Sequence, residues 1–275
     1  MALIPPFFLD CVVSIGVAKQ GQKNWIGTGF IVGRPFEDVN GKKLYHTFLV
    51  TNKHVLENKR NIILRFNSLE NSPALDYPID LYPDGQSIWV GHTSPSVDIA
   101  AFYINPETLK NDAAQFQFFR MDEHTMSVTD MKSCGVSEGD GIFVLGFPMG
   151  IVAPQQNYVI ARTGAIARIR DVIEGQQAPY LIDATIFPGN SGGPVVIRPE
   201  AIAIHGTETI KRAALIGIVK SYVPYKDVAI SQQTGKPRVI FEENSGLALV
   251  ETVDNIVSTV NYCFQQKCTD GTRLR

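Results

Sequence analysis

The stretch from residue 187 to residue 194 reads FPGNSGGP, and it decides how the rest of the chain is interpreted. It places Ser191 among glycines, between Pro188 and Pro194, which cannot donate the hydrogen bonds of a strand ladder. Apolar runs flank it on both sides, YLIDATI before and VVI after. The stretch is therefore either a tight turn kept for its geometry or a loop that presents the Ser191 hydroxyl for chemistry.

The composition indicates a globular protein with a substantial core. The chain has 275 residues, of which 44% are hydrophobic and 19% are charged, enough for one large domain or two small ones. Its net charge of −2 argues against nucleic acid as a partner. No apolar run approaches the roughly 18 residues that span a bilayer, so we expect no membrane partner.

The cysteines and the N-terminal sequence bear on the cellular compartment. Cys11, Cys134, Cys263 and Cys268 are too sparse for a disulfide framework, so we expect mostly free thiols. They lack a matching histidine or cysteine cluster for zinc, and we expect neither a metal nor a cofactor. The N-terminal MALIPPFFLDC has no basic residue before Lys19 and is a poor signal peptide, which favours a cytoplasmic location.

Short β-branched runs, separated by turn residues, recur along the chain and predict an all-β sandwich or barrel. Asn40-Gly41 predicts a hairpin turn between GFIVG and HTFLVT. Apolar residues from Val250 to Phe264 follow a helical period, which predicts a terminal helix that packs as a cap. The weakly patterned segment 105–133 is interpreted as a linker between two β units, with a short helix after Pro106.

A serine nucleophile needs a base, and the base needs a third group that fixes its tautomer. Within FLVTNKHVL, His54 follows a strand-like run at the point where a strand would end and release its side chain, and Asp98 stands at the head of the apolar VDIAAFYI. Taken singly, these residues have ordinary interpretations. Ser191 would lie in a glycine turn, His54 would be a surface or core histidine whose hydrogen bonds are satisfied, and Asp98 would be a cap before a strand. Their combination, in the order histidine, aspartate, serine, favours a catalytic set.

A second enzyme class also fits the serine stretch. GNSGG matches the G-x-S-x-G elbow of α/β-hydrolases, in which a helix follows the serine and the acid and histidine come later in the chain. Here Pro194 and the β-branched VVI follow, and only His205 lies downstream. The order and the flanking pattern therefore disfavour an esterase of that fold.

Taken together, the chain resembles the chymotrypsin/trypsin-like serine proteases, and is most similar to their HtrA-like bacterial branch. The blocks that carry this resemblance run in family order: GTGFIV, LVTNKHVL, VDIAAFYI, EGDGIFVLGFPMG, TGAIARIR, IDATIFPGNSGGPVV and LIGIV. The resemblance implies a single peptidase domain over 1–275, built of two six-stranded antiparallel β-barrels and a C-terminal helix. We expect the first barrel at about 9–110, a linker at about 111–133, and the second barrel with the helix at about 134–266.

The resemblance also implies a serine endopeptidase acting through an acyl-enzyme on proteins or peptides. His54 would be the general base and acid, Asp98 its orienting carboxylate and Ser191 the nucleophile. The N–H groups of Gly189 and Ser191 would form the oxyanion hole. The alternative is a catalytically silent scaffold of the same fold that binds or regulates other proteins.

Several departures from the digestive members refine the expectation. Asn190 replaces the aspartate that pairs with a newly cleaved N-terminus, and Val55 stands where a cysteine follows the histidine, so zymogen processing and that disulfide are not expected. We also expect no PDZ domain after the terminal helix. Substrate recruitment would then depend on loops or on a separate regulatory partner; the oligomeric state stays open.

The specificity pocket is the least determined part of the site. Thr185 stands where trypsin-like members place a pocket-floor carboxylate, which disfavours cleavage after Arg or Lys. With Ile186, Lys220 and Tyr222 it is expected to bind a small-to-medium apolar side chain. The segments 198–214 and 222–244 are predicted as elaborated loops, the second as a possible lid.

Overall fold

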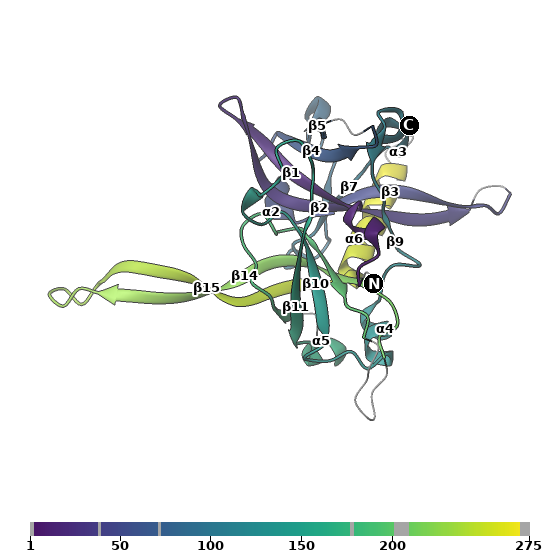
Figure 1. Cartoon of the computed structure of the whole chain (residues 1–275). Coiled ribbons are helices and arrows are strands. Elements are labelled where there is room, and N and C mark those ends of the chain that lie inside the picture. The colour runs from purple at the N-terminus through teal and green to yellow at the C-terminus, as the bar shows by residue number, and fades with distance from the viewer. Residues whose placement is uncertain (1–2, 38–39, 71–72, 177–178, 201–208, 270–275) are drawn as a thin grey trace.

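The computed structural model describes residues 3–37, 40–70, 73–176, 179–200 and 209–269. The chain is mostly β and forms two β units. In Figure 1 the N-terminal unit lies above the C-terminal unit. The short helices of the described residues are α1 (Pro6–Leu9), α2 (Lys53–Leu56), α3 (Pro106–Asn111), α4 (Val128–Ser133) and α5 (Arg170–Ile173), with 3₁₀ turns at Pro83–Gly85 and Pro148–Gly150. None of the helices in these residues is both long and apolar enough to cross a membrane.

The N-terminal unit is a nine-stranded sheet in which seven strands follow the order β5-β4-β1-β2-β3-β7-β6. Two short strands join its path, with β8 on β4 and β9 on β2. The predicted hairpin is confirmed, because β2 and β3 pair from Phe30 with Val50 to Glu37 with Lys43. The strands are β1 (Val12–Lys19), β2 (Gln22–Glu37), β3 (Lys43–Thr51), β4 (Asn61–Ser68), β5 (Leu75–Asp80), β6 (Val90–Gly91), β7 (Ala100–Tyr103), β8 (Ala114–Gln115) and β9 (Phe119–Arg120).

The C-terminal unit is a closed six-stranded barrel in the order β10-β11-β12-β15-β14-β13. Every residue of β10 and β13 is buried, which explains why their sequences, GIFVLG and PVVI, are continuously apolar or small. Together with the sheet and the terminal helix, this barrel confirms the predicted trypsin-like all-β fold. Where a six-stranded antiparallel first barrel was expected, the N-terminal unit is a nine-stranded sheet in which β9 runs parallel to β2. The strands are β10 (Gly141–Gly146), β11 (Ile160–Arg168), β12 (Tyr180–Asp183), β13 (Pro194–Ile197), β14 (Ala214–Ile230) and β15 (Pro237–Thr252).

One core joins the two units and the terminal helix α6 (Val253–Thr269). Phe30 of the sheet, Phe143 of the barrel, and Val253 and Val260 of α6 belong to the same buried cluster. In Figure 1, α6 lies beside both β units, as expected for a cap. Val250, which the periodicity placed in the helix, instead belongs to β15, because one buried face continues from the strand into the helix.

The segment predicted as a linker is more structured than its sequence suggested. The helix expected after Pro106 is present as α3, and the Asn105 side chain caps it by accepting from Glu107 N at 3.0 Å. Strands β8 and β9 and helix α4 lie within residues 114–133, with irregular segments between them. These elements are too short to show a period, which explains why the sequence pattern was weak.

The segment 222–244 is not a loop, and this prediction was wrong. Strands β14 and β15 continue past the barrel as a two-stranded ribbon, the long green arm in Figure 1. We call residues 224–244 the ribbon. In the other predicted loop, Glu200 N donates to Ile210 O at 2.9 Å, while residues 201–208 lie outside the described residues.

The thiol prediction agrees with the structure where it is described. Cys11, Cys134 and Cys263 take part in no disulfide within the described part of the chain, and Cys11 and Cys263 are buried. The side chain of Cys268 is not among those described.

Candidate functional site

The imidazole of His54 is positioned by the short helix α2, which begins directly after β3 and Asn52. Its Nδ1 atom lies 2.5 Å from Asp98 Oδ2, and its backbone N–H donates to Asp98 Oδ1 at 3.2 Å. Asn52 Nδ2 donates to the Asp98 carbonyl at 2.6 Å and ties the two segments together. Two segments 44 residues apart in the sequence are thus held in one geometry.

The Asp98 carboxyl group is kept ionised in this setting. Burial raises its pKa, but the hydrogen bond and charge of the His54 ring and the backbone N–H donors lower it by more. The net effect holds the pKa of Asp98 below its ordinary value of 3.8. A carboxylate in this state fixes the proton of His54 on Nδ1 and leaves Nε2 as the acceptor.

The loop that carries Ser191 needs its glycines for backbone geometry. Gly189 and Gly192 have φ values of 97° and 83°, in the left-handed region. A Cβ on Gly189 would lie 2.3 Å from Phe147 O, and one on Gly192 would lie 2.2 Å from Thr28 O. Both positions therefore exclude any side chain, and the serine is held at the tip of a close-packed turn.

Thr28 connects this loop to the N-terminal unit, a role that the sequence reasoning missed. Its N–H donates to Ser191 O at 2.9 Å, and its hydroxyl donates to Gly189 O at 2.6 Å. Thr51 donates in turn to Thr28 O at 2.7 Å. Thr28 stood out in the sequence only as a member of the GTGFIV block, and that position does not indicate which backbone groups its side chain contacts.

Two backbone donors beside the serine are uncommitted. Within the described part of the chain, neither the N–H of Gly189 nor that of Ser191 has a hydrogen-bond partner. Asn190 between them is buried, and as a neutral amide it avoids the cost of a buried carboxylate. Donors left free by a rigid turn are suited to an oxyanion, because they need no rearrangement to bind it.

A cavity of about 440 Å³ brings the predicted residues together. The walls are formed by His54, Asp98, Ile186, Phe187, Pro188, Ser191, Lys220, Ser221 and Tyr222. Ser191 is half-buried, and no hydrogen bond joins its hydroxyl to His54 among the described residues. The three predicted catalytic residues therefore share one cavity, with one of the two expected hydrogen bonds in place.

The predicted specificity residues divide into two groups. Ile186, Lys220 and Tyr222 line the cavity, and the Tyr222 hydroxyl donates to Glu242 at 2.6 Å. Thr185 is exposed and does not line the cavity. Successive side chains of an extended segment point to opposite sides, so Ile186 faces the cavity and its neighbour Thr185 faces away from it. The assignment of Thr185 to the pocket floor therefore has no support in the walls of this cavity.

A buried ion pair behind Asp98 was not predicted. Glu251 is 2% exposed, and its carboxylate accepts from Lys220 Nζ at 2.9 Å, from Asn255 Nδ2 at 3.2 Å and from Asp98 N at 3.4 Å. Lys220 also donates to Ser96 O at 2.8 Å. This pair connects the strands β14 and β15 to the segment that carries Asp98.

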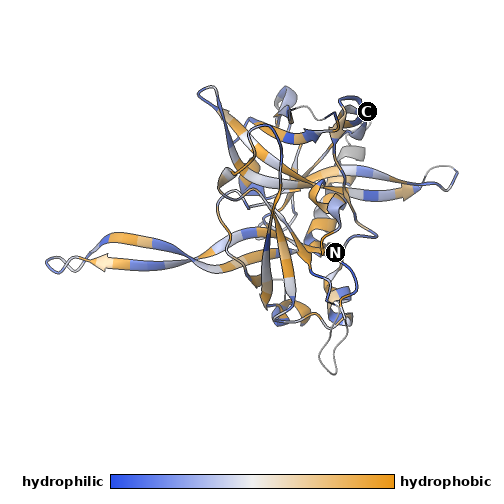
Figure 2. Cartoon of the chain, in the orientation of Figure 1, coloured by the Kyte–Doolittle hydropathy of each residue, from blue (hydrophilic) through white to orange (hydrophobic). Residues whose placement is uncertain are grey.

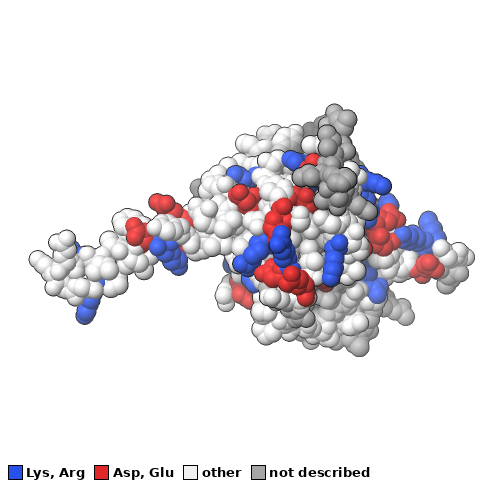
Figure 3. Space-filling view, turned by 90° about the horizontal axis from the view of Figure 1, so that it is seen from below, with Lys and Arg blue, Asp and Glu red and all other residues white. Residues whose placement is uncertain are grey.

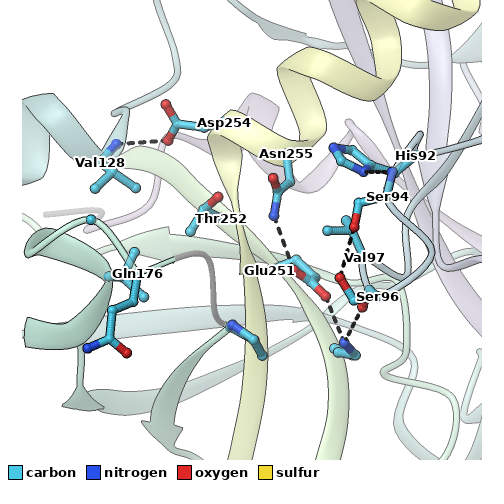
Figure 4. A pocket seen from close by; sticks show the side chains of 14 residues that line it. His92, Ser94, Ser96, Val97, Val128, Gln176, Glu251, Thr252, Asp254 and Asn255 are labelled. Atoms are coloured by element: carbon cyan, nitrogen blue, oxygen red, sulfur yellow. Dashed lines mark hydrogen bonds and ion pairs between the residues drawn. The ribbon is translucent and has the colours of Figure 1, made fainter.

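Lys220 and Glu251 also line a second cavity of about 430 Å³, shown in Figure 4. There the Glu251 side chain lies between Asn255 on α6 and the segment with Ser96. His92, Ser94, Asp254 and residues of the α5 region complete the polar and apolar lining. Lys220 thus lines both cavities, whereas Glu251 lines the second one alone.

The chain was compared with curated proteins and with solved structures. No curated protein matches this sequence. Among solved structures, the chain is similar to the MamO protease domain from Magnetospirillum magneticum, with 16% identity and a TM-score of 0.48, over 92% of this chain and 96% of that one. It is also similar to the HtrA-type protease AlgW with decapeptide, with 17% identity and a TM-score of 0.47, over 94% of this chain and 66% of that one.

A family match covers more than half of the chain. Residues 27–200 match the trypsin-like peptidase domain, a span that contains His54, Asp98 and Ser191. This span begins at the GTGFIV block and ends after the strand that follows the serine. The chain therefore belongs to the trypsin-like peptidase domain family.

Proposed function

We propose that this chain is a serine endopeptidase that hydrolyses peptide bonds of proteins through an acyl-enzyme on Ser191. The observation that carries the proposal is the 2.5 Å contact between His54 and Asp98 at the wall of the cavity that contains Ser191. The family supports a peptidase, and the cavity supplies a nucleophile, a base and an orienting carboxylate in one place.

The reaction follows from the positions of these groups. As Ser191 Oγ bonds to the substrate carbonyl carbon, its proton passes to His54 Nε2 and the carbonyl electron pair moves to oxygen. The free N–H groups of Gly189 and Ser191 bind that oxyanion. When the C–N bond breaks, the proton on His54 moves to the departing amine.

Deacylation repeats these steps with water. His54 accepts a proton from water as the water oxygen attacks the acyl carbon, and the Ser191–acyl bond breaks with return of the proton to Ser191. Asp98 remains ionised throughout and holds the Nδ1 proton. The products are a free carboxylate and the regenerated serine.

The walls of the cavity favour an apolar residue before the cleaved bond. Ile186, Phe187 and Pro188 form one side of it, and the Glu251 carboxylate nearby is already paired with Lys220. A guanidinium or ammonium that enters would therefore lack a free buried partner. Mass-spectrometric profiling of a digested denatured protein mixture tests this, and a dominant Arg or Lys preference would contradict it.

A catalytically silent scaffold is the second candidate. It is favoured by one observation, the absence of a hydrogen bond between His54 and Ser191 among the described residues. Catalytic hydrogen bonds are often long in unliganded enzymes and tighten around substrate, so this geometry is compatible with an active enzyme. Turnover decides between the two candidates.

The test compares wild type with Ser191→Ala on a denatured protein substrate. We expect Ser191→Ala to lose nearly all turnover, whereas Ser137→Ala, an exposed serine away from the cavity, keeps it. Turnover that survives in Ser191→Ala contradicts the mechanism. Absence of turnover in wild type, with binding retained, favours the silent scaffold.

A further inference from the structure

The ribbon is a sheet fragment with no core of its own. Its strands pair from Pro224 with Asn244 to Ile230 with Pro237, beyond the last contact of the barrel. Its end is closed by Ser231 N, which donates to Lys236 O at 3.0 Å. An isolated two-stranded ribbon is marginally stable in water, so one this long calls for a partner.

Apolar side chains occupy both faces of the ribbon. Residues directly opposite in an antiparallel pair share a face, so Val228 and Ile240 lie on one face, and Val239 and Phe241 on the other. Ile240 is 62% exposed and Phe241 is 55% exposed. The ribbon contributes six of the eleven large hydrophobic side chains exposed in the described chain: Tyr225, Val228, Ile230, Val239, Ile240 and Phe241.

The colour and charge views agree with this description. Figure 2 shows orange segments alternating with blue along the ribbon. Six of the 21 residues of the ribbon are charged. Figure 3 shows charged side chains toward the barrel and at the far end of the ribbon, with an uncharged surface between them. The exposed apolar side chains between these charges form the kind of surface that pairs with another chain.

One edge of the ribbon leads directly into the cavity with Ser191. Strand β13 covers β14 only as far as Ile218, and Val219 is bonded to the serine loop, with its N–H on Gly193 O at 2.9 Å. Beyond Val219, this edge of β14 has no backbone partner among the described residues. The next residues along it, Lys220 to Tyr222, line the cavity.

The base of the ribbon is fixed to the cavity wall. The Tyr222 hydroxyl donates to Glu242 at 2.6 Å, and the side-chain amide of Asn244 donates to Ile186 O. Tyr222 and Ile186 both line the cavity. A polypeptide bound along the ribbon is therefore delivered in a fixed direction relative to Ser191.

We propose that the ribbon binds an extended apolar segment of the polypeptide substrate, which adds to the free edge of β14 as an antiparallel third strand. This inference rests on the proposed function and assigns the substrate class to it. An antiparallel strand that ends in the cavity places its ribbon-bound residues on the amino side of the cleaved bond. From Tyr222 to Ile230 the edge spans about 26 Å at the usual strand rise, room for about eight substrate residues.

The continuity of the edge is what favours substrate over a second copy of the chain. A copy that paired with the ribbon would satisfy its backbone groups but would have no reason to align with the cavity. A substrate strand satisfies the same groups, covers the apolar faces and places its bond at Ser191 in one binding event. A second copy is therefore treated as an outcome of the test.

The test measures kcat/KM for peptides that share one cleaved bond and carry two, five or eight residues on its amino side. We expect kcat/KM to rise about tenfold or more between the two-residue and the eight-residue peptide. In the variant with Val228→Thr and Ile240→Thr, which changes one exposed face, this gain should shrink while the short peptide is cleaved as in wild type. Leu69→Thr, at a 65% exposed apolar residue of the N-terminal unit, is the matched control and should keep the gain.

Backbone pairing is tested by N-methylation of the eight-residue peptide. Methyl groups on alternate amides block strand addition in one register and spare it in the other, because successive N–H groups point to opposite sides. We expect one methylated register to reduce kcat/KM to the level of the two-residue peptide and the other to retain most of the gain. Equal effects of the two registers would contradict strand addition.

Binding to the Ser191→Ala chain separates this inference from the proposed function. Fluorescence anisotropy should show tighter binding of the eight-residue peptide than of the two-residue peptide, with the difference reduced by the ribbon variant. If this holds and wild type cleaves nothing, the ribbon site stands and the endopeptidase fails. If the gain with length is unchanged in the ribbon variant, or if that variant only converts an oligomer to a monomer on light scattering, the inference is overturned.

Discussion

Removing the Lys220 ammonium should destabilise the fold through the carboxylate that it leaves behind. Glu251 has a side chain only 3% exposed, and Lys220 Nζ is its cationic partner at 2.9 Å. In Lys220→Met, the partners of this carboxylate that remain among the described residues are Asn255 and the N–H of Asp98, at 3.2 Å and 3.4 Å. Breaking a buried ion pair costs about 3 to 5 kcal/mol.

The expected loss is near the lower end of that range. The Lys220 side chain is 24% exposed, so water reaches part of the space that the ammonium occupied. We expect Lys220→Met to lower the free energy of unfolding by about 3 kcal/mol, measured by urea denaturation. For a chain of this size that is a fall in Tm of about 6 to 12 °C.

Two controls isolate the buried charge. Lys226→Met removes the partner of Glu242 at 3.4 Å, but both side chains are well exposed, so stability should hardly change. Adding Glu251→Gln to Lys220→Met removes the orphaned charge and should restore part of the loss. If Lys220→Met is no more destabilising than Lys226→Met, the buried-pair argument is refuted.

Three further predictions follow from the geometry. Gly192→Ala should cost about 3 kcal/mol or more in urea denaturation, whereas Gly175→Ala, also at positive φ but with open space around it, should cost only about 1 to 2; equal costs would mean that the turn yields. Asp98→Asn should lower kcat by about 10⁴-fold, because the amide favours the wrong tautomer of the histidine, and a loss under tenfold would contradict the orienting role. Burial raises the pKa of Asp76, but Arg65 and Lys23 lower it by more, so the folded-state pKa lies below the ordinary value of 3.8. The stability that the Asp76 carboxylate contributes is therefore fully present above pH 3.8 and is lost as the pH falls through the lower folded-state pKa. Acid titration of the free energy of unfolding should show a smaller loss in Asp76→Asn than in wild type, and identical curves for the two proteins would count against this role of Asp76.

The sequence predicted the fold because its signals were local and repeated. Short β-branched runs, the Asn40-Gly41 turn and the terminal apolar period each depend on neighbouring residues. They correspond to the strands, to the β2–β3 hairpin and to α6. The weakly patterned 105–133 segment was misjudged because elements of two residues, such as β8, leave no period to detect.

Part of the candidate site could be proposed from the sequence for a related reason. Histidine is scarce and His54 follows a strand-like run, Asp98 precedes an apolar run, and Ser191 lies in a glycine loop. All three line one cavity of the structure. Thr28 and the pair of Lys220 with Glu251 act through contacts between distant segments, which no sequence window contains.

The ribbon was taken for a loop because its charged residues, its two prolines and Gly235 masked the strand pattern. In segment 222–244, apolar residues on both faces replace the usual alternation of apolar and polar residues. A strand without a buried face has no reason to alternate. The length of the ribbon could therefore be determined only from the structure.

The most direct test of the account is labelling with a fluorophosphonate probe, which bonds covalently to a serine only when its hydroxyl is activated. Wild type and Ser191→Ala are treated in parallel, with His54→Ala as the variant that keeps the serine but lacks its base. We expect labelling of wild type at Ser191, located by peptide mass spectrometry, and near-complete loss of labelling in both variants. Labelling that persists in Ser191→Ala, or that is equally strong in His54→Ala, would contradict an activated serine at this site.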